Sequence, residues 1–108
     1  AHCLIDRTGQ VIQFVPFNKR AWHAGLSSYA GRARCNDYSI GIELEGSDFI
    51  AYTEPQYQAL TRLTETIVST FPQITTERIT GHQYIAPLRK TDPGLVFDWQ
   101  KFKGELKV

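Results

Sequence analysis

The run SIGIELEG, residues 39–46, shows the clearest alternation of apolar and polar positions in the chain. Its two faces carry different side chains: Ile40, Ile42 and Leu44 on one, and Gly41, Glu43 and Glu45 on the other. Alternation of this kind predicts a β-strand with one face against the core. If the apolar face meets the core, two carboxylates project from the opposite face.

Two further β-rich runs, residues 2–6 and 11–15, are separated by Arg7-Thr8-Gly9-Gln10, which predicts a hairpin with a glycine in its turn. Pro16 ends the second run. Residues 17–38 then show no clear period and exceed the usual loop length of about 4–6 residues. We therefore expect a functional loop or a binding surface there.

Residues 53–71 carry the best helical pattern. The residues that follow helical spacing are Tyr57, Leu60, Leu63, Thr64, Ile67, Val68 and Phe71. Thr53 suits the N-cap, Glu54 and Pro55 suit the first turn, and Pro72 ends the run.

Two shorter elements complete the pattern. We expect a strand over residues 77–81 that leads to His82, and a last helix capped by Asp98 that runs through Trp99, Phe102 and Leu106. Strands interleaved with helices predict a layered α/β or α+β fold. The length of 108 residues fits one domain over the whole chain, without a linker or repeat.

The composition is 42% hydrophobic and 21% charged, with a formal net charge of +1. Because phosphate binding needs a basic face, this balance argues against nucleic acid as a partner. The apolar runs fall far short of the roughly 20 residues that span a bilayer, so no membrane is expected either. We expect a monomer.

The cysteines and the chain start add two expectations. Cys3 and Cys35 are too few for a disulfide framework and are expected as reduced thiols, with a bridge between them left open. No export signal opens the chain. The opening AHCLID resembles a strand already under way, so an N-terminal portion is expected to be absent.

The segment TGHQYIAPLRKTDPG, residues 80–94, places His82, Lys90 and Asp92 close together in sequence. In extended backbone, residues two apart point the same way, so Lys90 and Asp92 should share one side. An imidazole and a carboxylate are common zinc ligands, and a lysine beside them can stabilise the negative charge that develops on a substrate oxygen during a reaction. The pattern indicates half of a catalytic metal site, although each residue alone could be an ordinary surface residue.

Three other groups stay open on the sequence. Glu43 or Glu45 could be a general base or the solvated face of a strand. Trp22 and His23 could form a platform for a sugar or peptide, or Trp22 could anchor the loop to the core. Arg32 and Arg34 could bind a substrate carboxylate or keep the loop soluble.

Together these segments resemble the amidase-2 family of zinc N-acetylmuramoyl-L-alanine amidases. The resemblance rests on AHCLIDRTGQVIQFVPF, RAWHAGLSSYAGRARCND, SIGIELEG and TGHQYIAPLRKTDPG followed by FDW, in order and with similar spacing. It implies an α/β fold in which helices flank a mixed β-sheet. It also implies zinc, a muropeptide substrate and, for the subgroup most similar, cleavage of anhydro-muropeptides during cell-wall recycling in the bacterial cytoplasm.

The resemblance also assigns roles to single residues. His82 and Asp92 match two zinc ligands, Glu43 the catalytic carboxylate and Lys90 the lysine near the metal. Trp22 and Arg34 match positions that contact the muropeptide, whereas His2 and His23 match histidines outside the metal set.

The family's first zinc histidine lies on a strand upstream of Ala1, and this sequence contains no such strand. The sheet is therefore expected to lack its N-terminal strand, which would leave an edge or an apolar face uncovered. Two alternatives follow: a peptidoglycan-binding module without turnover, or an incomplete folding unit.

Overall fold

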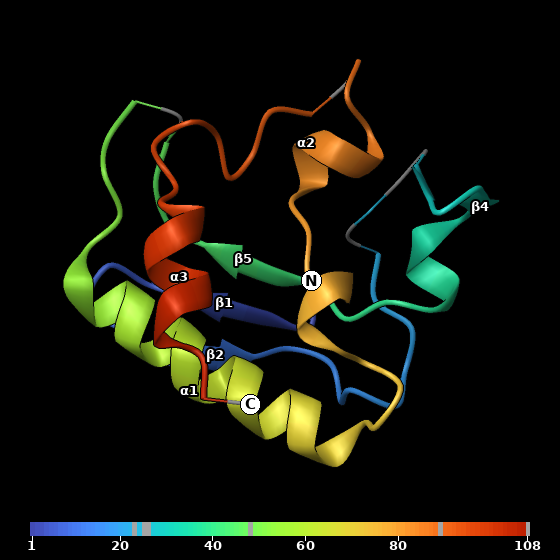
Figure 1. Ribbon diagram of the computed structural model, residues 1–108, viewed down its shortest axis with the longest axis horizontal. Helices are drawn as coiled ribbons and strands as arrows, with labels where there is room; N and C mark the ends of the chain where they lie inside the picture. The colour runs from blue at the N-terminus through green and yellow to red at the C-terminus, as the bar shows by residue number, and fades with distance from the viewer. Residues whose placement is uncertain (23, 25–26, 48, 89, 108) are drawn as a thin grey trace.

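The computed structural model describes residues 1–22, 24, 27–47, 49–88 and 90–107. Figure 1 shows the elements in chain order. The strands are β1 (Cys3–Ile5), β2 (Val11–Gln13), β3 (Ser28–Tyr29), β4 (Arg32–Ala33) and β5 (Ile42–Leu44). The α-helices are α1 (Glu54–Thr70), α2 (His82–Ile85) and α3 (Trp99–Glu105), and Cys35–Asp37 and Thr76–Arg78 form 3-10 turns.

The main sheet has three strands in the order β2-β1-β5. β1 pairs antiparallel with β2 through the predicted hairpin, where Gly9 has a φ of +88°. β1 pairs parallel with β5, with Leu4 opposite Glu43. The sheet is therefore mixed, as the family resemblance implied.

The alternation predicted for β5 is confirmed. Ile42 and Leu44 are half-buried, while Glu43 between them is exposed. The strand is shorter than the predicted run of residues 39–46. It begins at Ile42, after Ile40 and Gly41, and ends at Leu44. Glu43 consequently projects from the face opposite the core.

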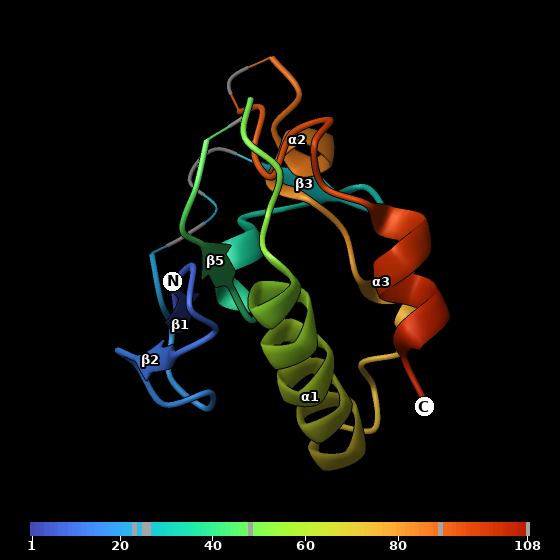
Figure 2. The same cartoon turned by 90° about the vertical axis from the view of Figure 1, so that its left-hand side faces the viewer.

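The long helix α1 packs against β1 and α3. In Figure 2, α1 lies between the sheet and α3, so both helices lie on the same side of the sheet. The core combines Ile5 of β1, Tyr57 and Leu60 of α1, and Phe97 and Phe102 near the C-terminus. Thr53 is the N-cap of α1 and Asp98 that of α3, as predicted.

The predicted strand over residues 77–81 is wrong. Thr76–Arg78 forms a 3-10 turn, and the residues after it join no strand. The ammonium group of Lys103 on α3 donates to the carbonyls of Thr76 and Ile79, so a side chain satisfies one carbonyl of the predicted strand and the carbonyl just before it. Polar Thr75-Thr76-Glu77-Arg78 also lacks the apolar alternation of a strand.

The segment 17–38 holds more structure than expected of a loop, because β3 and β4 pair as a small hairpin within it. Cys3 and Cys35 are both buried and free, which agrees with the expectation of reduced thiols. Burial raises the pKa of the Cys3 thiol. Among the described residues, no helix is long and apolar enough to cross a membrane.

Gln56 is a fully buried polar residue that ties α1 to both parallel strands. Its Nε2 donates to the Glu45 carbonyl at 2.8 Å and to the Ile5 carbonyl at 3.3 Å. Its Oε1 accepts the backbone N–H of Thr53 at 2.9 Å and completes a capping box. One side chain therefore joins the helix start to the ends of β1 and β5.

Replacing Gln56 by leucine is expected to lower the free energy of unfolding by about 3 kcal/mol, because the backbone groups of Ile5, Glu45 and Thr53 lose the buried amide as their partner. Urea denaturation followed by circular dichroism measures this loss. Gln58→Leu on the same helix is the matched control, since Gln58 is exposed and should change stability by less than about 0.5 kcal/mol. Equal losses in the two variants would contradict the role of Gln56.

Candidate metal and catalytic site

His82 and Asp92 are brought together by backbone contacts between their segments. His82 is the first residue of α2, and the next backbone N–H, that of Gln83, donates to the Asp92 carbonyl at 3.0 Å. A Cβ at Gly81 would lie 2.9 Å from Cδ of Pro93. The glycine therefore allows the two segments to approach this closely.

The core anchors the Asp92 end of this pair. The hydroxyl of Tyr52 donates to the Pro93 carbonyl at 2.9 Å. The Tyr52 ring is itself buried and packs edge-on against Phe97, with 5.9 Å between the ring centroids. Asp92 is thus placed by a residue that belongs to the hydrophobic core.

Both ring nitrogens of His82 have oxygen partners. Nε2 lies 2.9 Å from the Ala24 carbonyl oxygen, and Nδ1 lies 3.3 Å from Oδ2 of Asp92. A carbonyl oxygen can only accept, so Nε2 carries the hydrogen and donates it. In the neutral ring, the Nδ1 lone pair then faces a carboxylate oxygen, and these two acceptors need a cation or a proton between them.

This donor set fits a zinc ion. Two ligands of tetrahedral zinc, with bonds of about 2.0–2.2 Å, lie about 3.4 Å apart, which matches the His82–Asp92 separation of 3.3 Å. Metal-bound histidines commonly donate their second ring N–H to a carbonyl, as His82 does to Ala24. Within the described residues, no group of three or more His, Cys, Asp or Glu side chains could hold a metal ion.

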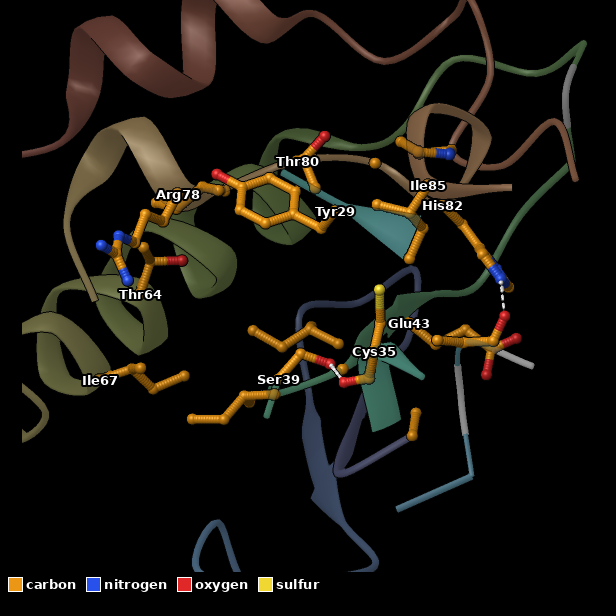
Figure 3. A pocket seen from close by; sticks show the side chains of 18 of the residues that line it. Tyr29, Cys35, Ser39, Glu43, Thr64, Ile67, Arg78, Thr80, His82 and Ile85 are labelled. Atoms are coloured by element: carbon orange, nitrogen blue, oxygen red, sulfur yellow. Dashed lines mark hydrogen bonds between the residues drawn. The ribbon is translucent and has the colours of Figure 1, made fainter. Parts of the chain in front are cut away.

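One cavity of about 1200 Å³ gathers most of the predicted site residues. Glu43, His82, Lys90, Asp92 and Trp22 all line it. Figure 3 shows Glu43 and His82 at one end of the cavity and Thr64, Ile67 and Arg78 toward the other. The structure therefore places an imidazole, two carboxylates and a lysine around a shared space.

The two glutamates of the β5 segment have different surroundings. Glu43 lines the cavity, whereas Glu45 is not among the residues that line it. The Glu45 carboxylate instead accepts the Arg7 backbone N–H at 2.9 Å. Geometry therefore favours Glu43 over Glu45 as the candidate base.

The two predicted substrate contacts also differ. The Trp22 side chain is 79% exposed, lines the cavity and lies under the Arg20 guanidinium, 5.0 Å from the ring centroid. Trp22 therefore does not anchor its loop to the core. Arg34 is exposed and is not among the lining residues, whereas Arg32 lines the cavity and stacks on the Tyr38 ring.

His2 takes no part in this cluster. His2 is buried and contacts backbone groups of other segments. His23 lies outside the described residues. The residues that sequence inspection missed are Ala24, Tyr52 and Gly81, and the contacts of Ala24 and Tyr52 bridge 58 and 41 positions. Of these three residues, only Gly81 lies within the motif at residues 80–94, where the sequence could have pointed to a close approach of the backbone.

Comparison with known proteins identifies the family. Residues 1–95 match the Amidase_2 family, described as N-acetylmuramoyl-L-alanine amidase. The chain therefore belongs to this family of amidases.

The relatives include the 1,6-anhydro-N-acetylmuramyl-L-alanine amidase AmpD of Escherichia coli. It is 59% identical over 103 residues, which cover 95% of this chain and 56% of the relative. A crystal structure of an AmpD selenomethionine derivative superposes with a TM-score of 0.96 at 58% identity, covering 99% of this chain and 59% of that one. The chain thus spans somewhat more than half the length of these relatives.

A more distant structure carries a ligand. It is a complex of the amidase AmiD from E. coli with the substrate anhydro-N-acetylmuramic acid-L-Ala-D-γ-Glu-L-Lys. AmiD is 34% identical with a TM-score of 0.90, and the match covers 100% of this chain and 48% of that one.

Proposed function

We propose that this chain is the main part of a zinc-dependent amidase. The bond cut joins the lactyl group of 1,6-anhydro-N-acetylmuramic acid to L-alanine in muropeptides. The observation that carries the proposal is the convergence of His82 Nδ1 and Asp92 Oδ2, at 3.3 Å, in a cavity shared with Glu43 and Lys90. The names of AmpD and of the AmiD complex support the choice of substrate.

His82 and Asp92 would hold the zinc. When bound, zinc supplies a Lewis acid and lowers the pKa of a coordinated water. Catalytic zinc usually has three protein ligands. A third ligand from residues that precede Ala1 stays a prediction, and the intact mass of the natural protein tests whether such residues exist.

The other residues of the cavity supply proton transfer, charge and binding. Glu43 accepts the proton of the attacking water and then passes it to the leaving amine nitrogen of L-alanine. The Lys90 ammonium stabilises the negative charge that develops on the carbonyl oxygen. The exposed Trp22 ring offers an apolar surface for sugar or peptide, and Arg34 stays a predicted peptide contact from outside the cavity lining.

The proposal includes a cellular role. Anhydro-muropeptides arise from cell-wall turnover, so the chain would act in cell-wall recycling in the bacterial cytoplasm. A monomer with neither nucleic acid nor a membrane as partner stays the expectation.

A second candidate function is a muropeptide-binding module without turnover. It is favoured by one observation: the described residues provide two groups for a metal and no cluster of three. Under this alternative the cavity binds the ligand, and Glu43 and Lys90 contribute only polar contacts.

The experiment measures zinc content and peptide release on the purified full-length natural protein. We expect about one zinc per chain and release of the L-alanine-led peptide from an anhydro-muropeptide. His82→Ala should lose both, because Asp92 would keep no nitrogen partner. Muropeptide binding without zinc or cleavage would overturn the amidase proposal in favour of the binding module.

A further inference from the structure

His2 is a buried polar side chain that the proposed chemistry does not use. Its side chain is 1% exposed, and its ring contacts backbone groups of two segments distant in sequence. Nε2 lies 2.7 Å from the Lys19 carbonyl oxygen, and the Gly41 N–H donates to Nδ1 at 3.1 Å. Both segments lead directly to residues of the cavity.

These contacts define the state of the ring. Because a backbone N–H can only donate, Nδ1 must carry a lone pair, and because a carbonyl can only accept, Nε2 must carry the hydrogen. His2 is therefore a neutral imidazole with its hydrogen on Nε2. One nitrogen accepts from the β5 side and the other donates to the loop side.

On the β5 side, His2 fixes the register of β5 against β1. Its backbone N–H also donates to the Gly41 carbonyl at 2.8 Å, so Gly41 is held at both its N–H and its C=O. Glu43 follows two residues later, opposite Leu4. A slip of one residue would move Glu43 to the other face of the sheet.

On the loop side, His2 fixes the start of the segment from Lys19 to Ala24. Trp22 lies in this segment, and the Ala24 carbonyl at its end accepts from His82. The buried Ala21 lies between. The two histidines thus hold the two ends of the segment that presents the Trp22 ring.

We propose that His2 is a positioning residue for the amide hydrolysis. Its neutral ring sets Glu43 for proton transfer through Gly41, and sets Trp22 for ligand binding through Lys19. This inference rests on the proposed function. It adds one residue, His2, that positions both the candidate base Glu43 and the segment that carries Trp22.

Two conservative variants of the full-length, zinc-loaded protein separate the contacts. Asparagine places an oxygen at the position of Nδ1 and should keep the Gly41 contact, whereas glutamine places an amide nitrogen at the position of Nε2 and should keep the Lys19 contact. We expect His2→Asn to raise KM about tenfold with kcat within about twofold, as one lost hydrogen bond implies. We expect His2→Gln to lower kcat about tenfold with KM within about twofold.

The opposite pattern, or equal changes of both constants in the two variants, overturns the inference. Leu63→Ala is the control, because it weakens the packing of α1 on the core without touching either contact, lies outside the cavity lining and should leave kcat and KM unchanged while folded. Nitrogen NMR of the wild-type ring gives a measurement independent of variant folding. A hydrogen on Nδ1 at the assay pH overturns the inference as well.

Failure of the proposed function gives a different result. If the wild-type protein binds the muropeptide without cleaving it, the amidase proposal fails. Weaker ligand binding by His2→Asn than by His2→Gln still supports the positioning of Trp22 in that case. Equal binding by the two variants overturns it.

Discussion

Replacing Glu43 by glutamine is expected to lower kcat for muropeptide cleavage about 100- to 10,000-fold, the range typical of a lost general base. Glutamine keeps the size and the polarity of the side chain but cannot accept a proton from water. Because Glu43 is exposed on β5 and lines the cavity, the substitution should leave the fold and the His82–Asp92 pair intact. Initial rates at saturating substrate and zinc provide the measurement.

Glu45→Gln is the matched control for this variant. Glu45 has the same chemistry two residues later, but its carboxylate accepts the Arg7 N–H and does not line the cavity. We expect its kcat to stay within about threefold of the wild type, with a small loss of stability from the weakened contact. A larger loss of turnover in Glu45→Gln than in Glu43→Gln would reassign the base to Glu45.

Replacing Lys90 by alanine is expected to lower kcat about 100- to 1000-fold, equivalent to about 3–4 kcal/mol of barrier. Lys90 is half-buried and lines the same cavity as Asp92, and its backbone N–H donates to the Ala86 carbonyl, so the backbone there does not depend on the ammonium group. KM should change much less, because the charge that Lys90 stabilises develops after binding. Steady-state kinetics over a range of substrate concentrations separates the two constants.

Two further variants test whether charge or bulk explains the effect. Lys90→Arg keeps a cation and should recover part of kcat, although the guanidinium places it differently. Lys107→Met removes a lysine that is exposed and outside the cavity, and should have no effect. Equal kcat in Lys90→Arg and Lys90→Ala would argue against a role for charge.

The sheet and the long helix were predictable because their patterns are local. The alternation of Ile42, Glu43 and Leu44 specifies which face is exposed, and the hairpin follows from a short polar turn with Gly9. Thr53 and Pro55 define the start of α1 within the sequence itself. In each case the deciding residues lie within a few positions of one another.

The wrongly predicted strand over residues 77–81 shows a segment whose structure depends on residues distant in sequence. The Ile79 carbonyl within it and the Thr76 carbonyl just before it accept from Lys103, more than 20 positions away on α3, and no pattern near Thr76 carries that information. The buried amide of Gln56 belongs to the same class. A glutamine on a helix usually faces solvent, and its partners on β1 and β5 become visible only in three dimensions.

The candidate site was predictable as a set of residues and not as an arrangement. The motif at residues 80–94 named His82, Lys90 and Asp92, and the structure brings all three to one cavity. Arg34 was chosen over Arg32 by position in the motif, yet Arg32 lines the cavity. Two arginines so close in sequence differ in surroundings because the β4 strand ends between them.

The contact between His82 and Ala24 links events at the two ring nitrogens of His82, because a charge beside one nitrogen changes the hydrogen bond made by the other. A cation beside Nδ1 draws electron density through the ring and strengthens the donation from Nε2 to the Ala24 carbonyl. Loss of a cation at Nδ1 should therefore weaken the hydrogen bond that holds the end of the segment carrying Trp22. Under the proposed function, removal of zinc is therefore expected to weaken muropeptide binding as well as to abolish hydrolysis.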